Sequence, residues 1–139
     1  MFKGILLAYD GSDGAKQALA RGAEIASAGS ATLHLIAVGR VPEYAETQDE
    51  VDEAREQAES FYGKRIEEAV GLLQARGITP TTHVVFGKPS EQILRIAQEI
   101  QADLIVLGVH PHHPLRRRLL GATADKIVDH AECSVLVVR

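Results

Sequence analysis

Two loops of the sequence concentrate the side chains that can bind a ligand. In the first, residues 10–14, Asp10 and Ser12 offer a carboxylate and a hydroxyl group. Asp10 is suited to hold either a metal ion that accompanies a nucleotide or a ribose hydroxyl. The alternative is structural: Asp10 and Ser12 turn the chain and cap the following helix, whose dipole favours Asp13. The loop alone leaves both interpretations open.

The second loop, residues 108–123, leads into a helix expected to begin near Ala122. Three consecutive arginines, residues 116–118, precede this helix, and arginines beside a helix N-terminus predict an anion site. The loop also contains His110, His112 and His113. Imidazoles can bind Zn, Cu or Ni, but two of these are adjacent and prolines flank the group. We therefore expect solvated loop histidines rather than a metal site.

The remaining polar residues assemble no recognisable catalytic site. No P-loop pattern is present, and no G-x-G-x-x-G follows the first apolar run. His34, His83 and His130 have no nucleophile and orienting group that the sequence places beside them. Cys133 begins an apolar run, where a buried and unreactive thiol is expected. We therefore expect a protein that is not an enzyme.

The elements that must position the two loops are indicated by short apolar runs. They are nearly continuous rather than alternating, which is typical of strands covered on both faces. These expected strands are residues 4–9, 32–38, 81–86, 103–108 and 133–138. Segments of helical period separate them, which predicts an α/β fold with a mostly parallel sheet and helices on both faces. Both loops follow strands, at the edge of such a sheet where ligands bind.

The helical segments show apolar stripes at spacings of three and four residues. A helix over residues 15–26, one after Pro89 and one over residues 124–131 are expected. The longest helix is predicted to span residues 47–76. The side chains expected to face inward in the longest and the last helix are Ala54, Ala58, Phe61, Ala69, Leu72, Ala124, Ile127, Val128 and Ala131.

Composition limits the class of protein. The 139 residues are 45% hydrophobic and 24% charged, which is typical of one globular domain spanning residues 1–139. A net charge of −4 and 4% aromatic residues without Trp argue against nucleic acid as a partner. No apolar run approaches the roughly 20 residues that span a membrane. A single cysteine and the lack of a signal-peptide pattern favour the cytoplasm.

Five segments together resemble the universal stress protein (UspA-like) family, over the whole chain. They are residues 5–12, 33–38, 87–89, 102–108 and 130–138. The resemblance implies a Rossmann-like, five-stranded parallel sheet of order 3-2-1-4-5 and a homodimer. It also implies a stress-response regulatory protein, many of whose relatives bind ATP or AMP, with Mg²⁺, through a G-x-x-G-x9-G-[ST] motif at the tops of strands 1 and 4. The binding positions that it implies here are Ala8, Asp10, Val38, Gly108, His110, Gly121, Ala122 and Thr123.

This chain departs from the family motif at two positions. Pro111 replaces the second glycine, which fixes φ and removes an N–H group. Ala122 occupies the Ser/Thr position, and Thr123 lies about 100° further round the helix. Each lost hydrogen bond to a charged phosphate costs about 1.5–3 kcal/mol. Two functions are the main alternatives: a nucleotide-binding stress protein, or one that acts only through dimerisation and protein partners. Weak ATP hydrolysis is a third, for which the sequence identifies no base or nucleophile.

The last expected strand carries the prediction about assembly. The family pattern puts Ser134–Val138 at an edge of the sheet, and the run contains no Lys or Pro to block pairing. Antiparallel pairing with the same strand of a second copy would satisfy both edges in a closed contact. We therefore predict a homodimer formed through this strand.

Overall fold

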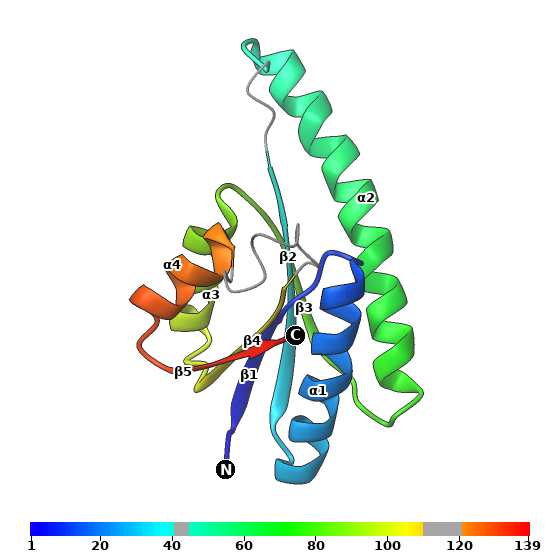
Figure 1. Cartoon of the computed structure of the whole chain (residues 1–139). Helices are drawn as coiled ribbons and strands as arrows, with labels where there is room; N and C mark the ends of the chain where they lie inside the picture. The colour runs from blue at the N-terminus through cyan, green and yellow to red at the C-terminus, as the bar shows by residue number, and fades with distance from the viewer. Residues whose placement is uncertain (41–44, 110–120) are drawn as a thin grey trace.

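The computed structural model describes residues 1–40, 45–109 and 121–139. Strands and helices alternate along this chain, and the sheet has five strands (Figure 1). In chain order the elements are β1 (Gly4–Ala8), α1 (Asp13–Gly29), β2 (Thr32–Gly39), α2 (Gln48–Gln74), β3 (Thr81–Phe86), α3 (Pro89–Glu99), β4 (Leu104–Gly108), α4 (Ala122–His130) and β5 (Ser134–Val138). The α/β fold predicted from the apolar runs is confirmed.

The strands are all parallel and follow the order β3-β2-β1-β4-β5, as the resemblance implied. From the central strand β1 the chain first builds outward through β2 and β3. It then returns to the other side of β1 and adds β4 and β5. The strand order therefore reverses between β1 and β4, and a crevice opens at the carboxyl ends of strands at such a reversal.

Helices cover both faces of the sheet, α1 and α2 on one and α3 and α4 on the other (Figure 1). Successive strand residues point to opposite faces, so β1 contributes Leu7 to one core and Leu6 to the other. Both side chains are fully buried. Burial on two faces explains why the strands are continuous apolar runs.

Local capping interactions fix where the helices begin. The Ser12 hydroxyl oxygen accepts a hydrogen bond from the Ala15 backbone N–H at 3.2 Å, which caps α1. Thr47 caps α2 in the same way, at 3.1 Å from the Glu50 N–H. Pro89 stands at the start of α3, where its missing N–H has no intrahelical partner to lose.

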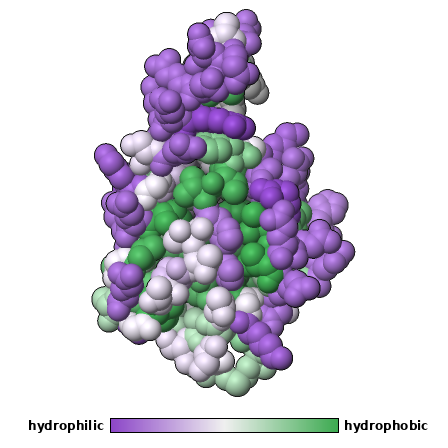
Figure 2. All heavy atoms as spheres, turned by 180° about the vertical axis from the view of Figure 1, so that it is seen from behind, coloured by the Kyte–Doolittle hydropathy of each residue, from purple (hydrophilic) through white to green (hydrophobic). Residues whose placement is uncertain are grey.

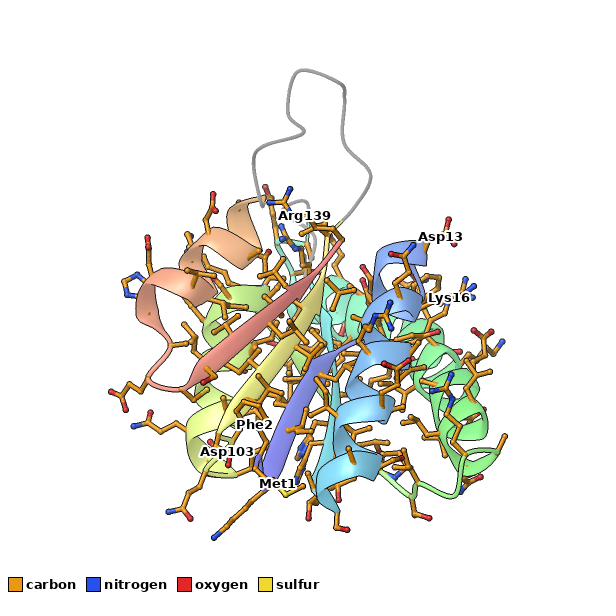
Figure 3. The ribbon with its side chains drawn as sticks, turned by 60° about the horizontal axis from the view of Figure 1, so that its bottom comes forward. Met1, Phe2, Asp13, Lys16, Asp103 and Arg139 are labelled. Atoms are coloured by element: carbon orange, nitrogen blue, oxygen red, sulfur yellow. The ribbon has the colours of Figure 1, made fainter. Side chains whose placement is uncertain are left out.

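The two ends of the sheet are chemically different. Figure 3 shows Met1 and Asp103 at one end and Asp13 and Arg139 at the other. The Asp103 carboxylate accepts hydrogen bonds from the backbone N–H groups of Lys3 and Gly4 at 2.9–3.1 Å, which lowers the pKa of Asp103. These bonds hold the starts of β1 and β4 together, at the end of the sheet opposite the carboxyl ends of the strands.

The inward face predicted for α2 is partly wrong. Phe61 and Leu72 are 50% and 53% exposed, and the buried residues are Ile66, Ala69 and Leu73. The N-terminal half of α2 projects beyond the sheet (Figure 1) and its surface is almost entirely hydrophilic (Figure 2). The stripe that packs continues through Tyr62, one position from Phe61, so Phe61 faces solvent.

A smaller correction concerns α4 and the strand boundaries. Val128, expected to face inward, is 47% exposed, because Ala124 and Ile127 alone define the buried face of this short helix. Tyr9, Asp103 and Cys133 fall just outside the strands predicted to include them. The expected positions of the five strands are otherwise confirmed.

Candidate functional site

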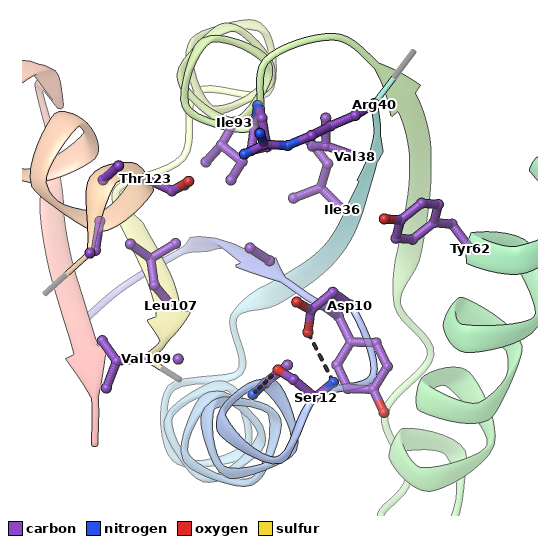
Figure 4. Close-up of a pocket in the computed structure, with 18 residues that line it drawn as sticks. Asp10, Ser12, Ile36, Val38, Arg40, Tyr62, Ile93, Leu107, Val109 and Thr123 are labelled. Carbon is purple, nitrogen blue, oxygen red and sulfur yellow. Dashed lines mark hydrogen bonds between the residues drawn. The ribbon is translucent and has the colours of Figure 1, made fainter. Parts of the chain in front are cut away.

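A cavity of about 440 Å³ lies at the carboxyl ends of the strands, and we call it the upper cavity (Figure 4). Its walls come from the ends of β1, β2 and β4, from the first residues of α1, α3 and α4, and from one side chain of α2. The lining residues are Ala8, Tyr9, Asp10, Ser12, Ala15, Ile36, Val38, Arg40, Tyr62, Pro89, Ile93, Leu107, Gly108, Val109, Gly121, Ala122, Thr123 and Ala124.

Seven of the eight residues predicted to bind a ligand line this one cavity. They are Ala8, Asp10, Val38, Gly108, Gly121, Ala122 and Thr123. The eighth, His110, lies outside the described residues, as do Pro111, His112, His113 and the three arginines at 116–118. The structure thus brings the described residues together, and their role toward a nucleotide stays a prediction.

The turn after β1 positions the Asp10 carboxylate. Its Oδ1 accepts a hydrogen bond from the Ser12 backbone N–H at 2.9 Å, while Ser12 caps α1. Gly11 between them has φ of 83°, in the left-handed region that glycine adopts without strain. The interpretation that Asp10 and Ser12 turn the chain and cap α1 is therefore confirmed. The same turn also directs Asp10 to the edge of the cavity (Figure 4), so the two interpretations are compatible.

Gly108 forms part of the floor of the upper cavity for a packing reason. A Cβ atom on Gly108 would overlap the carbonyl oxygen of Gly14, and one on Gly14 would overlap that of Val109. These two glycines let the end of β4 lie directly against the start of α1. The Val109 N–H in turn donates to the Val138 carbonyl oxygen at 3.1 Å. The floor is therefore backbone packed against backbone.

Among the described residues, the first N–H groups of α4 have no hydrogen-bond partner. Gly121 precedes the helix with φ of 97°, and no side chain of the described ranges caps the first turn. Free N–H groups and the positive end of the helix dipole favour an anion at such a position. Thr123 does not point away as its place on the helix suggested: it lines the cavity, with its hydroxyl directed inward (Figure 4).

Burial shifts the pKa of one tyrosine in the wall. Tyr9 is 2% exposed, and burial, with a smaller effect of the Glu68 carboxylate, raises the pKa of its hydroxyl, while Arg65 opposes this shift. Its hydroxyl oxygen has no hydrogen-bond partner among the described residues. Tyr9 therefore stays protonated and neutral near neutral pH, so it adds no charge to the site.

Two polar side chains of the cavity wall were not predicted. Arg40 follows β2, and in the view of Figure 4 its side chain extends from Val38 in the direction of Ile93. Tyr62 reaches the cavity from α2. The position of Arg40 directly after a strand was the available signal. For Tyr62 the sequence offered none, because its contact depends on how α2 lies across the sheet.

A second cavity, of about 460 Å³, lies at the opposite ends of α3 and α4, and we call it the lower cavity. It is lined by Leu94, Ala97, Gln98, Gln101, Ala102, Ile105, His130, Ala131, Glu132 and Cys133. Cys133 is half-buried rather than buried as predicted, and burial raises the pKa of its thiol, which favours the protonated form. None of the residues chosen from the sequence as ligand-binding lies in this cavity.

The histidines of the described chain form no metal site. No group of three or more His, Cys, Asp or Glu residues within the described ranges could hold a metal ion. His34 and His83 do form a pair, with Nδ1 of the first 3.0 Å from Nε2 of the second. Burial lowers the pKa of both rings.

Across the part of the chain that the structure describes, no helix is both long and apolar enough to cross a membrane.

Comparison with known proteins agrees with this architecture. A universal stress protein of Thermus aquaticus is 36% identical over 150 residues, covering all of both chains. The solved structure of UspA from Lactobacillus plantarum has a TM-score of 0.83 and 29% identity, over 99% of this chain and 97% of that one. A universal stress protein solved in complex with cAMP has a TM-score of 0.77 and 25% identity, over 99% and 97%.

The sequence model of the universal stress protein family matches residues 1–139. That match spans both loops, all five strands and every described residue of the upper cavity. The fold, the full-length relatives and the family match lead to one conclusion. The chain belongs to the universal stress protein family.

Proposed function

We propose that this protein is a regulatory protein that binds an adenine nucleotide, ATP or AMP, in the upper cavity. The observation that carries the proposal is the cavity itself. Where the strand order reverses, it combines an apolar wall, the Asp10 carboxylate and the N-terminal start of α4. A related protein was solved with cAMP, which supports an adenine nucleotide as the ligand class.

The described residues divide the upper cavity into parts that suit the parts of a nucleotide. Ile36, Val38 and Ile93 form an apolar wall for the base. Asp10 at the cavity edge is an acceptor for ribose hydroxyls. The start of α4 and the Thr123 hydroxyl supply donors for phosphate oxygens, with Mg²⁺ accompanying ATP. A volume of about 440 Å³ lies within the usual range for small-molecule sites.

The proposal is for binding rather than catalysis. Along the cavity wall Asp10 is the one carboxylate and Arg40 the one cation among the described residues, and no histidine or cysteine lines it. Acid–base or nucleophilic catalysis needs a paired group within hydrogen-bonding reach. Binding that changes what the protein presents to a partner in the cytoplasm is the function that these groups support.

Calorimetric titration and thermal unfolding with MgATP and AMP test this proposal. A ligand at about 100 times its Kd adds about 2.7 kcal/mol to the free energy of unfolding, so the melting temperature rises. Asp10→Asn keeps the acceptor for the Ser12 N–H, removes the charge and should weaken binding about tenfold. Glu132→Gln, in the lower cavity, is the matched control and should change nothing.

No heat and no change in melting temperature at several millimolar of either nucleotide would contradict nucleotide binding. The alternative function, a stress protein that acts only through dimerisation and protein partners, would then be the better description.

The edge strand β5 supports the proposal of a homodimer through Ser134–Val138. In the described sheet β5 pairs with β4 alone, so its outer backbone groups have no strand partner there. Val135, Leu136 and Val137 remain half-buried rather than buried. Antiparallel pairing of two copies would cover this edge. Light scattering at tens of micromolar should give the mass of a dimer, and a well-folded monomer would refute it.

A further inference from the structure

Arg40 is the side chain of the upper cavity whose position the proposed function leaves unexplained. It follows β2, and in the view of Figure 4 its side chain extends from Val38 in the direction of Ile93 of α3; all three residues line the cavity. Asp10, the other charged residue of the described wall, lies on a different side of the cavity. Arg40 therefore borders the apolar part of the site.

A guanidinium at the border of an apolar wall has a specific use. It is planar, permanently charged and weakly hydrated, so it stacks on aromatic rings in a way that an ammonium group does not. Because Arg40 is an exposed side chain of the same cavity, its guanidinium can lie over the outer face of an aromatic base that rests on Ile36, Val38 and Ile93. Attraction between a cation and the negative face of the ring then adds to the apolar contact.

We infer that Arg40 covers the base of the bound nucleotide by stacking its guanidinium on the ring, and so favours ligands with a large aromatic base. This inference rests on the proposed function, because it needs a nucleotide in the upper cavity. Arg40 is on this view a specificity-determining residue for the base and contributes little to holding phosphate. Purine nucleotides should consequently bind more tightly than pyrimidine nucleotides of equal charge.

The alternative role for Arg40 is an ion pair with phosphate, and two ligands separate the roles. AMP and adenosine share the base and ribose, and only AMP carries phosphate. If Arg40 stacks on the base, Arg40→Ala should weaken AMP and adenosine by the same factor, about threefold to thirtyfold. If it pairs with phosphate, Arg40→Ala should weaken AMP and leave adenosine unchanged.

Two further variants separate planarity from charge. Arg40→Lys keeps the charge and most of the stem but removes the plane, so it should lose nearly as much affinity as Arg40→Ala. Arg40→Met keeps the apolar stem without charge. Arg21→Ala is the control, since Arg21 lies on the exposed surface of α1 in an ion pair with Glu24. It should bind like the unchanged protein.

Calorimetric titrations of AMP, adenosine and UMP against these four variants give every comparison required. Equal losses for AMP and adenosine, with a reduced preference for AMP over UMP in Arg40→Ala, support the stacking role. Full affinity in Arg40→Lys, or a loss confined to AMP, would overturn it. If the unchanged protein binds none of the three ligands, the proposed function itself has failed, which is a distinct result.

Discussion

The upper and lower cavities have nearly the same volume, about 440 and 460 Å³, and both are lined by α3 and α4. They lie at opposite ends of these helices. The upper cavity meets Pro89 of α3 and Gly121 to Ala124 at the start of α4. The lower cavity meets Gln98 near the end of α3 and His130 at the end of α4.

Because the two cavities meet opposite ends of α3 and α4, their electrostatic environments are opposite. Helix starts present N–H groups and a partial positive charge, whereas helix ends present carbonyl oxygens and a partial negative charge. Glu132 adds a carboxylate to the lower cavity, whereas in the upper cavity the Arg40 cation offsets the Asp10 carboxylate. An anionic ligand is therefore favoured in the upper cavity alone. The two cavities have similar volumes, so volume does not identify the ligand site. The helix ends that line each cavity do identify it.

The largest expected effect comes from breaking the upper cavity at its floor. Gly108→Ala places a methyl group against the Gly14 backbone, which cannot move aside as a flexible side chain could. We expect a loss of about 3 kcal/mol in the free energy of unfolding, at the upper end of overpacking effects. Chemical denaturation measures it.

The matched control for this prediction is Gly63→Ala in α2. A Cβ atom there would meet nothing within 4 Å, so the substitution should stabilise the helix by about 0.5–1 kcal/mol. A Gly108→Ala protein as stable as the unchanged chain would show that the floor can relax.

An intermediate effect is expected at the start of α4, where charge sharpens the contrast between the cavities. Ala122→Ser adds a hydroxyl donor and should tighten ATP binding about tenfold. Ala122→Glu should weaken ATP binding at least as much by repulsion. The same glutamate should stabilise the native state by about 0.3–1 kcal/mol through the helix dipole.

Calorimetry and denaturation on the same two variants check this prediction. If Ala122→Glu weakens ATP binding while it raises the free energy of unfolding, the start of α4 is identified as the phosphate position. Unchanged ATP affinity in both variants would remove α4 from the site.

The smallest effect concerns a titrating pair that belongs to neither cavity. The pKa of His34 and of His83 is lowered by burial, and the Glu99 carboxylate partly offsets this for His83. The unfolded chain therefore binds more protons than the native protein below the ordinary histidine pKa of 6.5. The free energy of unfolding should therefore decrease as pH falls from about 6.5 towards the lowered pKa values of the two histidines in the native protein.

Urea denaturation from pH 7 to pH 5 measures this slope. Replacing both rings, His34→Gln with His83→Gln, should flatten it. Nucleotide affinity should be the same in this variant and in the unchanged protein, because neither His34 nor His83 lines the upper cavity. A slope that persists without the pair would assign it to other groups.

The sequence predicted the sheet and most of the cavity wall because both depend on local patterns. Continuous apolar runs identify strands covered on both faces, and residues after such strands must meet at one edge. Gly14 and Tyr62 could not be predicted, since their importance comes from contacts with segments distant in the chain. Phe61 was misplaced because the apolar pattern of α2 does not fix which stripe packs, and Phe61 lies one position from the stripe that contains Tyr62.

The contact between Gly14 and Gly108 also bears on folding kinetics. These residues are far apart in the sequence, so the floor of the upper cavity closes only when a long stretch of chain has been ordered. An interaction absent from the folding transition state slows unfolding and leaves the folding rate unchanged. A ligand held on this floor should therefore lengthen the lifetime of the native protein, which stopped-flow unfolding with and without AMP would measure. The lifetime of the folded chain would then depend on whether the site is occupied.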